Sequence, residues 1–159
     1  MNLRAATADD FDFIRQLTTD PANTPFIGDD DLDTLASHLQ TSRKRLLIWG
    51  DRAGFALFND IGAPSNCVEL FRLALAQTGT QGSQPFLAAL LEYGFDTLQA
   101  QRIWLDVSGE NIRAQRAYAR AGFVKEGHLR QHWYRPALGR NVDMLLFGML
   151  RAEWAALRS

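Results

Sequence analysis

The stretch from residue 67 to residue 107 constrains the fold more than any other part of the sequence. CVELFRLAL (67–75) and RIWLDV (102–107) are apolar runs of the length and composition typical of strands. Between them, PFLAALLEYGFDTL (85–98) places apolar residues at helical spacing, and Pro85 is acceptable in the first turn of such a helix. A strand, a helix and a strand in succession favour a parallel strand pair covered by a helix.

The two ends of the chain carry the pattern of antiparallel hairpins instead. RLLIW (45–49) and AGFALF (53–58) flank a Gly-Asp turn, and HLRQHWYR (128–135) and VDMLLFGML (142–150) flank a turn with Pro136 and Gly139. Hairpins around a central strand-helix-strand unit predict an α/β (α+β) fold, with a central mixed, mostly antiparallel sheet flanked by helices. The Pro- and Gly-bearing stretches are too short for linkers, so we expect a single domain over residues 1–159.

The first 40 residues predict a short strand and two helices. Leu3 to Ala6 is the strand, and Thr7 with Asp10 forms a capping-box pattern that begins the first helix. An acidic run then begins the second helix, where carboxylates complement the positive helix end. Its members are Asp29, Asp30, Asp31 and Asp33.

Charge and composition narrow the class of partner. The net charge of −1 argues against a general nucleic-acid binder, and no segment has the roughly 20 apolar residues of a membrane helix. The single cysteine, Cys67, excludes an intrachain disulfide and fits a reducing compartment, so we expect a cytoplasmic protein. Residues 1–66 carry 6 basic and 10 acidic side chains and residues 67–159 carry 11 and 8. This division suits a cationic substrate in the first part and a phosphate-bearing cofactor in the second, and uneven surface charge without functional meaning is an equal alternative.

The segment NIRAQRAYARAGF (111–123) contains the residues with the clearest chemical meaning. On a helix, Asn111 and Tyr118 fall about 20° apart and two turns apart, so they share one face. Three arginines, Arg113, Arg116 and Arg120, fall on the opposite side, which is most simply a solvated face. Taken alone, an Asn at a helix start is often a cap and a helical Tyr is more often a core residue.

Asn111, Ala114, Tyr118, Gly122 and Phe123 together reproduce the N-x-x-A-x-x-x-Y-x-x-x-G-F signature, so the chain resembles the GCN5-related N-acetyltransferase (GNAT) family. Glu126-Gly127 with Arg130 resembles the ribosomal-protein-acetylating branch of that family. The resemblance is strongest over residues 67–150. It implies a GNAT-like sheet in which a splayed strand pair binds acetyl-CoA.

The resemblance also implies roles for individual residues. Asn111 is expected to bind the pantetheine arm of acetyl-CoA, and the Tyr118 hydroxyl to donate to the leaving thiolate, since an ordinary phenol stays protonated at neutral pH. Backbone groups of Leu73, Ala74 and Leu75 are expected to pair with pantetheine and polarise the acetyl oxygen.

The loop AQTGTQGSQPF (76–86) stands where the family has a Gly-rich pyrophosphate loop of the form G-R-G-x-G. This chain departs from that pattern, because an alignment back from the helix puts Thr80 at the arginine position and retains only some of the glycines; a register shifted by one residue would use Gly82 instead. The expected pyrophosphate ligands are the backbone groups of Gly79, Thr80, Gln81, Gly82, Ser83 and Gln84.

The resemblance places a general base at Glu69, upstream on the cofactor strand, and Asp106 at the end of the next strand is its rival. The spacing of His38, His128 and His132 suggests no metal site. His132, Trp133 and Tyr134 are candidates for the wall of an acceptor pocket.

The sequence therefore predicts an acetyl-CoA-dependent N-acetyltransferase, in which a primary amine attacks the thioester directly. The acceptor is left open between a protein N-terminus or lysine and a small amine. A catalytically weak acyl-CoA-binding or sensing module is the alternative. As partners we expect acetyl-CoA and the unidentified amine, no nucleic acid and no membrane, and we allow for a homodimer.

Overall fold

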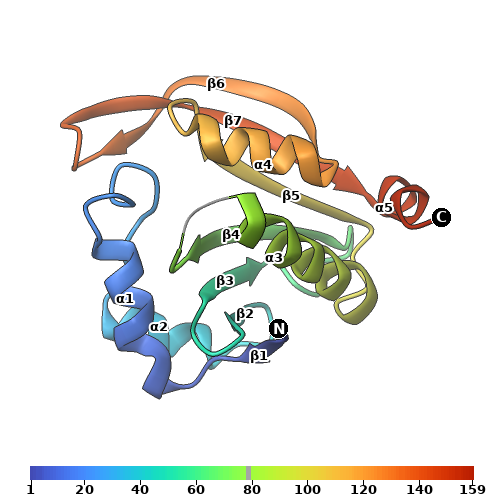
Figure 1. Ribbon diagram of the computed structural model, residues 1–159, viewed down its shortest axis with the longest axis horizontal. Helices are drawn as coiled ribbons and strands as arrows, with labels where there is room; N and C mark the ends of the chain where they lie inside the picture. The colour runs from blue at the N-terminus through green and yellow to red at the C-terminus, as the bar shows by residue number, and fades with distance from the viewer. Residues whose placement is uncertain (78–79) are drawn as a thin grey trace.

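The computed structural model describes residues 1–77 and 80–159 (Figure 1). The strands are β1 (Leu3–Ala5), β2 (Arg45–Trp49), β3 (Gly54–Asn59), β4 (Cys67–Leu75), β5 (Arg102–Ser108), β6 (Val124–Arg135) and β7 (Arg140–Leu150). The α-helices are α1 (Phe11–Thr19), α2 (Leu32–His38), α3 (Thr80–Glu92), α4 (Ile112–Ala121) and α5 (Arg151–Leu157). A 3-10 turn, η1 (Ala8–Asp10), precedes α1, and a π-helical turn, η2 (Tyr93–Thr97), follows α3.

The described strands form one sheet in the order β1-β2-β3-β4-β5-β7-β6. Every neighbouring pair is antiparallel except β4 and β5, which are parallel because α3 returns the chain between them. The two predicted hairpins are present as β2 with β3 and β6 with β7. The prediction of a mixed, mostly antiparallel sheet is confirmed.

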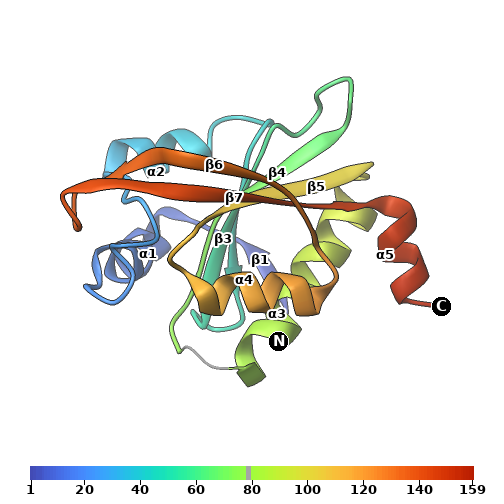
Figure 2. The ribbon, with the colours of Figure 1, turned by 90° about the horizontal axis from the view of Figure 1, so that it is seen from above.

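Helices cover both faces of the sheet, because the strands present apolar residues in both directions (Figure 2). One core packs under α3 and α4 and includes Phe86, Ile103 and Leu105. The second core packs under α1 and α2 and includes Ile14 and Phe55. Consequently the residues of β5 that alternate with Ile103 and Leu105 face the side of the sheet that α1 and α2 cover.

Strands β4 and β5 separate after a short stretch of pairing. Cys67, Val68 and Glu69 pair with Arg102 to Trp104, and no described residue from 70 to 75 pairs with β5. On its other edge β4 continues to pair with β3, where a bulge falls at Phe71: Leu57 pairs with Arg72 and Phe58 with Leu70. A bulge bends its strand and re-aims the side chains beyond it. The predicted splayed strand pair is thus confirmed.

Three local details differ from the predictions. Strand β6 begins at Val124, four residues before the predicted start at His128. Helix α3 begins at Thr80, five residues before Pro85, so the placement of Pro85 in the first turn was wrong. The proline is exposed inside the helix, where its missing N–H removes one backbone hydrogen bond. Helix α5 was not predicted at all, and it adds Trp154 to the core, stacked on Phe95 with ring centroids 5.0 Å apart.

Candidate active site

A cleft of about 1140 Å³ opens where β4 and β5 separate. One half is lined by β4, by Ser83, Phe86 and Leu87 of α3, and by much of α4. The other half is lined by the segment between α1 and α2, by Asp106 on β5 and by His132 and Trp133 on β6. A cleft of this size accommodates a large cofactor together with a small second substrate.

The backbone of Leu73, Ala74 and Leu75 lies along this cleft. These three residues pair with Ala56, Phe55 and Gly54 of β3 on one side only. Successive residues of a strand direct their N–H and C=O groups to alternate edges, so some of these groups face the space that β5 has left. Such groups can pair with the amides of an extended ligand.

The first turn of α3 forms the next part of the wall. Among the residues predicted to bind pyrophosphate, Gly79 lies outside the described residues, and α3 begins directly after it at Thr80. Gln81, Gly82 and Ser83 follow within that first turn, whose N–H groups point out of the helix end. Ser83 lines the cleft, whereas the side chain of Gln84 donates to the carbonyl of Ala117 at 3.2 Å and joins α3 to α4.

Asn111 is the N-cap of α4 and lies outside the helix proper. Its Oδ1 accepts a hydrogen bond from the backbone N–H of Ala114 at 3.2 Å. The capping role noted for such an Asn is therefore real, and the side-chain amide can still donate. Asn111 also lines the cleft, so the structure brings it and Tyr118 to one site as predicted.

Tyr118 is both a core residue and a cleft residue, with 8% of its surface exposed. Its ring packs edge-on against Phe123 with centroids 5.9 Å apart, and against Phe147 at 6.1 Å. Gly122 makes the first contact possible, because its φ of +107° ends α4 and turns Phe123 back towards the tyrosine. Burial, and to a lesser degree the charge of Asp106, raise the pKa of the Tyr118 hydroxyl above its ordinary value.

Two carboxylates meet on the α1 and α2 side of the sheet. Glu69 is 9% exposed, and burial followed by the charges of Asp106 and Asp60 raises its pKa to about 7. Burial also raises the pKa of Asp106. Asp106 is among the described residues that line the cleft and Glu69 is not, so Asp106 has the more direct access to a substrate.

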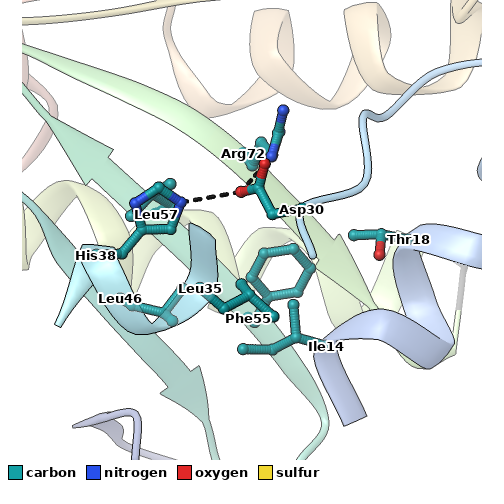
Figure 3. A pocket seen from close by; sticks show the side chains of 9 residues that line it. All are labelled: Ile14, Thr18, Asp30, Leu35, His38, Leu46, Phe55, Leu57 and Arg72. Atoms are coloured by element: carbon teal, nitrogen blue, oxygen red, sulfur yellow. Dashed lines mark hydrogen bonds and ion pairs between the residues drawn. The ribbon is translucent and has the colours of Figure 1, made fainter. Parts of the chain in front are cut away.

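The segment between α1 and α2, which lines the acceptor half, is fastened by arginines that sequence reasoning missed. Arg72 of β4 contacts Asp30 at 2.5 Å, and His38 contacts the same carboxylate oxygen at 2.9 Å (Figure 3). Burial alone would raise the pKa of Asp30, but the hydrogen bonds from Arg72 and His38 hold it below its usual value. These three residues line a cavity of about 10 Å³ beside the main cleft.

Arg135, at the end of β6, makes a second attachment to this segment. Its guanidinium donates to the carbonyl oxygens of Thr24 at 2.6 Å and Ile27 at 2.8 Å, and it stacks on the Trp133 ring at 3.8 Å. Trp133 and His132 line the cleft as predicted, but Tyr134 is 57% exposed and is not among the lining residues.

The α4 arginines form an exposed face, as predicted, and that face also borders the cleft. Arg113, Arg116 and Arg120 are exposed, but all three also line the cleft. The wheel correctly placed them opposite the core, and it could not show that this side of α4 borders a second wall.

Among the described residues, no three His, Cys, Asp or Glu side chains gather in a metal-binding arrangement. His128 contacts Asp143 at 2.7 Å, in an exposed pair. No helix in the described ranges is both long enough and apolar enough to cross a membrane.

Comparison with known families decides the relationship of the chain. The family model described as "Acetyltransferase (GNAT) domain" matches residues 1–124. The chain belongs to the GNAT acetyltransferase family.

Two curated GNAT relatives are similar over part of the chain. An uncharacterised N-acetyltransferase named p20, from Bacillus licheniformis, is 38% identical over 66 residues, which are 42% of this chain and 36% of that protein. The spermidine N(1)-acetyltransferase of Vibrio cholerae is 34% identical over 64 residues, which are 40% and 36%. The chain therefore matches only about a third of the length of each relative.

Solved structures confirm the GNAT fold over the whole chain. A spermidine N-acetyltransferase from Vibrio cholerae in complex with CoA and spermine has a TM-score of 0.83 at 23% identity, covering 97% of both chains. A dodecameric structure of spermidine N-acetyltransferase from the same organism has a TM-score of 0.82 at 23% identity, covering 99% of this chain and 98% of that one.

The comparisons confirm the family and do not specifically support the predicted affinity with the ribosomal-protein-acetylating branch, since these GNAT relatives are spermidine acetyltransferases or uncharacterised. The residues of that pattern have a structural role. Glu126 makes a two-pronged ion pair with Arg102 of β5, and Gly127 packs beside Leu146. This stretch therefore holds the sheet together.

Proposed function

We propose that this GNAT protein transfers the acetyl group of acetyl-CoA to a primary amine of a small polyamine. The observation that carries the proposal is the cleft between β4 and β5, which unites the backbone of Leu73–Leu75, Asn111 and Tyr118. Acetyl-CoA supplies the acetyl group as an activated thioester. The amine attacks it directly, without a covalent enzyme intermediate.

The residues divide the work of binding. Cleft-facing backbone groups of Leu73–Leu75 pair with the pantetheine arm and polarise the acetyl oxygen, and the Asn111 amide donates to the same arm. The first turn of α3, from Thr80, takes the pyrophosphate. Binding through backbone groups leaves the side chains free to pack, which explains how one strand serves both purposes.

Different side chains act at the leaving sulfur and at the proton of the amine. Tyr118 donates a hydrogen bond to the leaving sulfur, and its raised pKa keeps it protonated at neutral pH. A phenol of that weakness stabilises a thiolate by hydrogen bonding more readily than by full proton transfer. One carboxylate accepts the proton of the amine: Asp106 can do so directly from within the cleft, and Glu69, its rival, through water.

Two observations support a polyamine acceptor. The curated relative from Vibrio cholerae is named for spermidine, and a structural neighbour was solved with spermine. In this chain the net charge of residues 1–66 is negative, and Asp106 presents a carboxylate to the acceptor half of the cleft. The comparisons offer no such support for a protein N-terminus as acceptor.

The test is thiol release from acetyl-CoA with a panel of amines: spermidine, spermine, a free amino acid and a peptide with a free N-terminus. We expect turnover to be fastest with spermidine or spermine. If acetyl-CoA binds but no amine releases thiol, the protein is an acyl-CoA-binding module and the enzymatic proposal fails. Faster turnover with the peptide would overturn the polyamine assignment alone.

A further inference from the structure

The outer side of α4 carries a continuous stripe of positive charge. Arg113, Arg116 and Arg120 are three and four residues apart, a spacing that aligns side chains along one helix face. All three are exposed, and all three line the cleft. The stripe therefore borders the cofactor half of the site.

These arginines are unusual because they lack partners within the described part of the chain. Most other arginines contact carboxylates or carbonyl oxygens. Examples are Arg102 with Glu126 and Arg140 with Glu110. No ion pair or hydrogen bond to a described residue engages the stripe, although like charges at this spacing repel one another. An anion bound between the arginines would relieve that repulsion.

The position of the stripe matches a part of CoA that the proposed function leaves unassigned. CoA carries a pyrophosphate and, on its ribose, a 3′-phosphate of about two negative charges at neutral pH. The pyrophosphate is assigned to the first turn of α3. Helices α3 and α4 lie side by side, joined by the bond from Gln84 to Ala117, so the stripe stands next to that turn.

The pyrophosphate loop of this chain departs from the family pattern, so positive charge for binding CoA has to come from elsewhere in the cleft. Thr80 occupies the position at which the family loop carries an arginine. The cleft wall formed by α4 supplies three arginines instead. Guanidinium groups bind phosphate oxygens with paired, charge-assisted hydrogen bonds.

We propose that Arg113, Arg116 and Arg120 form a binding site for the ribose 3′-phosphate of CoA. The inference rests on the proposed function, because it requires CoA in this cleft. It assigns the stripe to the adenosine end of the cofactor, apart from the reacting thioester.

Titration calorimetry with CoA and with 3′-dephospho-CoA tests the assignment. We expect the unaltered protein to bind CoA at least about tenfold more tightly than 3′-dephospho-CoA, as charge-assisted bonds to one phosphate allow. The triple variant R113A/R116A/R120A should bind both ligands with about the same affinity. Arg43→Ala, which removes an exposed arginine from the loop before β2, is the matched control and should keep the preference.

The outcomes separate cleanly. A triple variant that retains the preference for CoA overturns the proposal. The same holds if its affinities for CoA and for 3′-dephospho-CoA both fall by the same factor. Thermal unfolding of the variant should match that of the control, because the substituted side chains are exposed. If the unaltered protein binds neither ligand, the proposed function itself fails along with this inference.

Discussion

Arg135 donates a hydrogen bond to the carbonyl oxygen of Ile27, 108 positions earlier in the chain. This bond joins the end of β6 to the segment that lines the acceptor half of the cleft. Arg135 is 8% exposed, and its guanidinium also donates to the Thr24 carbonyl oxygen. The shape of the acceptor half therefore depends on a side chain that is not itself among the cleft-lining residues.

Arg135→Met should loosen this segment. The change leaves two carbonyl oxygens without their donor, so we expect the free energy of unfolding to fall by about 1–3 kcal/mol in urea denaturation. The KM for the amine should rise while the KM for acetyl-CoA changes little. Arg158→Met is the control, because it removes an exposed arginine that contacts Asp96 on the far side of the fold. It should change neither the free energy of unfolding nor the KM for the amine. Equal effects on both KM values would contradict the positioning role.

The stability of the protein should decrease as pH rises towards 7, because Glu69 has a pKa of about 7 against an ordinary value of 4.5. Between these values the folded state binds more protons than the unfolded state, so stability is lost through this window and levels off above it. Glu69→Gln should remove the loss and gain about 1–3 kcal/mol over the unaltered protein between pH 5 and pH 8. Glu92→Gln at the exposed end of α3 is the control, and urea denaturation at both pH values is the measurement. If the free energy of unfolding of Glu69→Gln falls with pH as steeply as that of the unaltered protein, other titrating groups cause the loss.

The two carboxylates should differ in their effect on the rate. Asp106 lines the cleft and Glu69 does not, so Asp106→Asn should lower kcat on the order of 10²-fold and Glu69→Gln by less. The kcat/KM of the unaltered enzyme should rise with pH as the base ionises, and because burial raises the pKa of Asp106 this rise should lie above the ordinary range of an aspartate. A larger loss for Glu69→Gln would identify Glu69 as the principal base.

Asn111→Ser separates capping from cofactor binding. Serine is as good an N-cap as asparagine, so the bond to the Ala114 N–H is retained and the melting temperature should change little. The amide donor is lost, and CoA should bind several-fold more weakly in calorimetry. Asn111→Ala should show the same weakening with a further loss of about 1 kcal/mol in stability. If the serine variant binds CoA normally, Asn111 is a cap alone.

The sequence predicted those features of the fold and the site that local patterns encode. Alternating and apolar runs located β4 and β5 within a residue, and the Asn111 to Phe123 signature located the cleft. The start of α3 was missed because Gln81, Gly82 and Ser83 carry no helix signal and Pro85 suggested a later start. The bulge at Phe71 and the attachment of Arg135 to Thr24 depend on contacts across the fold, which no local pattern contains. The exposure of the α4 arginines was predicted correctly, but their position beside the cleft was not, because a helical wheel shows only which side chains face the core.

The sharpest prediction concerns Tyr118, where the enzymatic and binding-module interpretations part. Tyr118→Phe keeps the ring packed against Phe123 and Phe147 and removes only the hydroxyl, to which the structure gives no hydrogen-bond partner among the described residues. The fold should survive, since the hydroxyl is removed without leaving another polar group unsatisfied. Loss should appear in kcat, on the order of 10²-fold, with the KM for acetyl-CoA little changed.

Tyr93→Phe is the matched control for this variant, because Tyr93 stacks on Phe58 with centroids 5.9 Å apart and is not among the residues that line the cleft. It should leave kcat unchanged, so that any loss at Tyr118 is assigned to the position of that hydroxyl and not to the chemistry of the substitution. Steady-state thiol release and thermal unfolding are measured on both proteins. If Tyr118→Phe turns over its amine at the parental rate, the tyrosine only packs the core; if it unfolds while Tyr93→Phe does not, the hydroxyl is structural. A slow, well-folded variant that still binds acetyl-CoA is the result that the proposed chemistry requires.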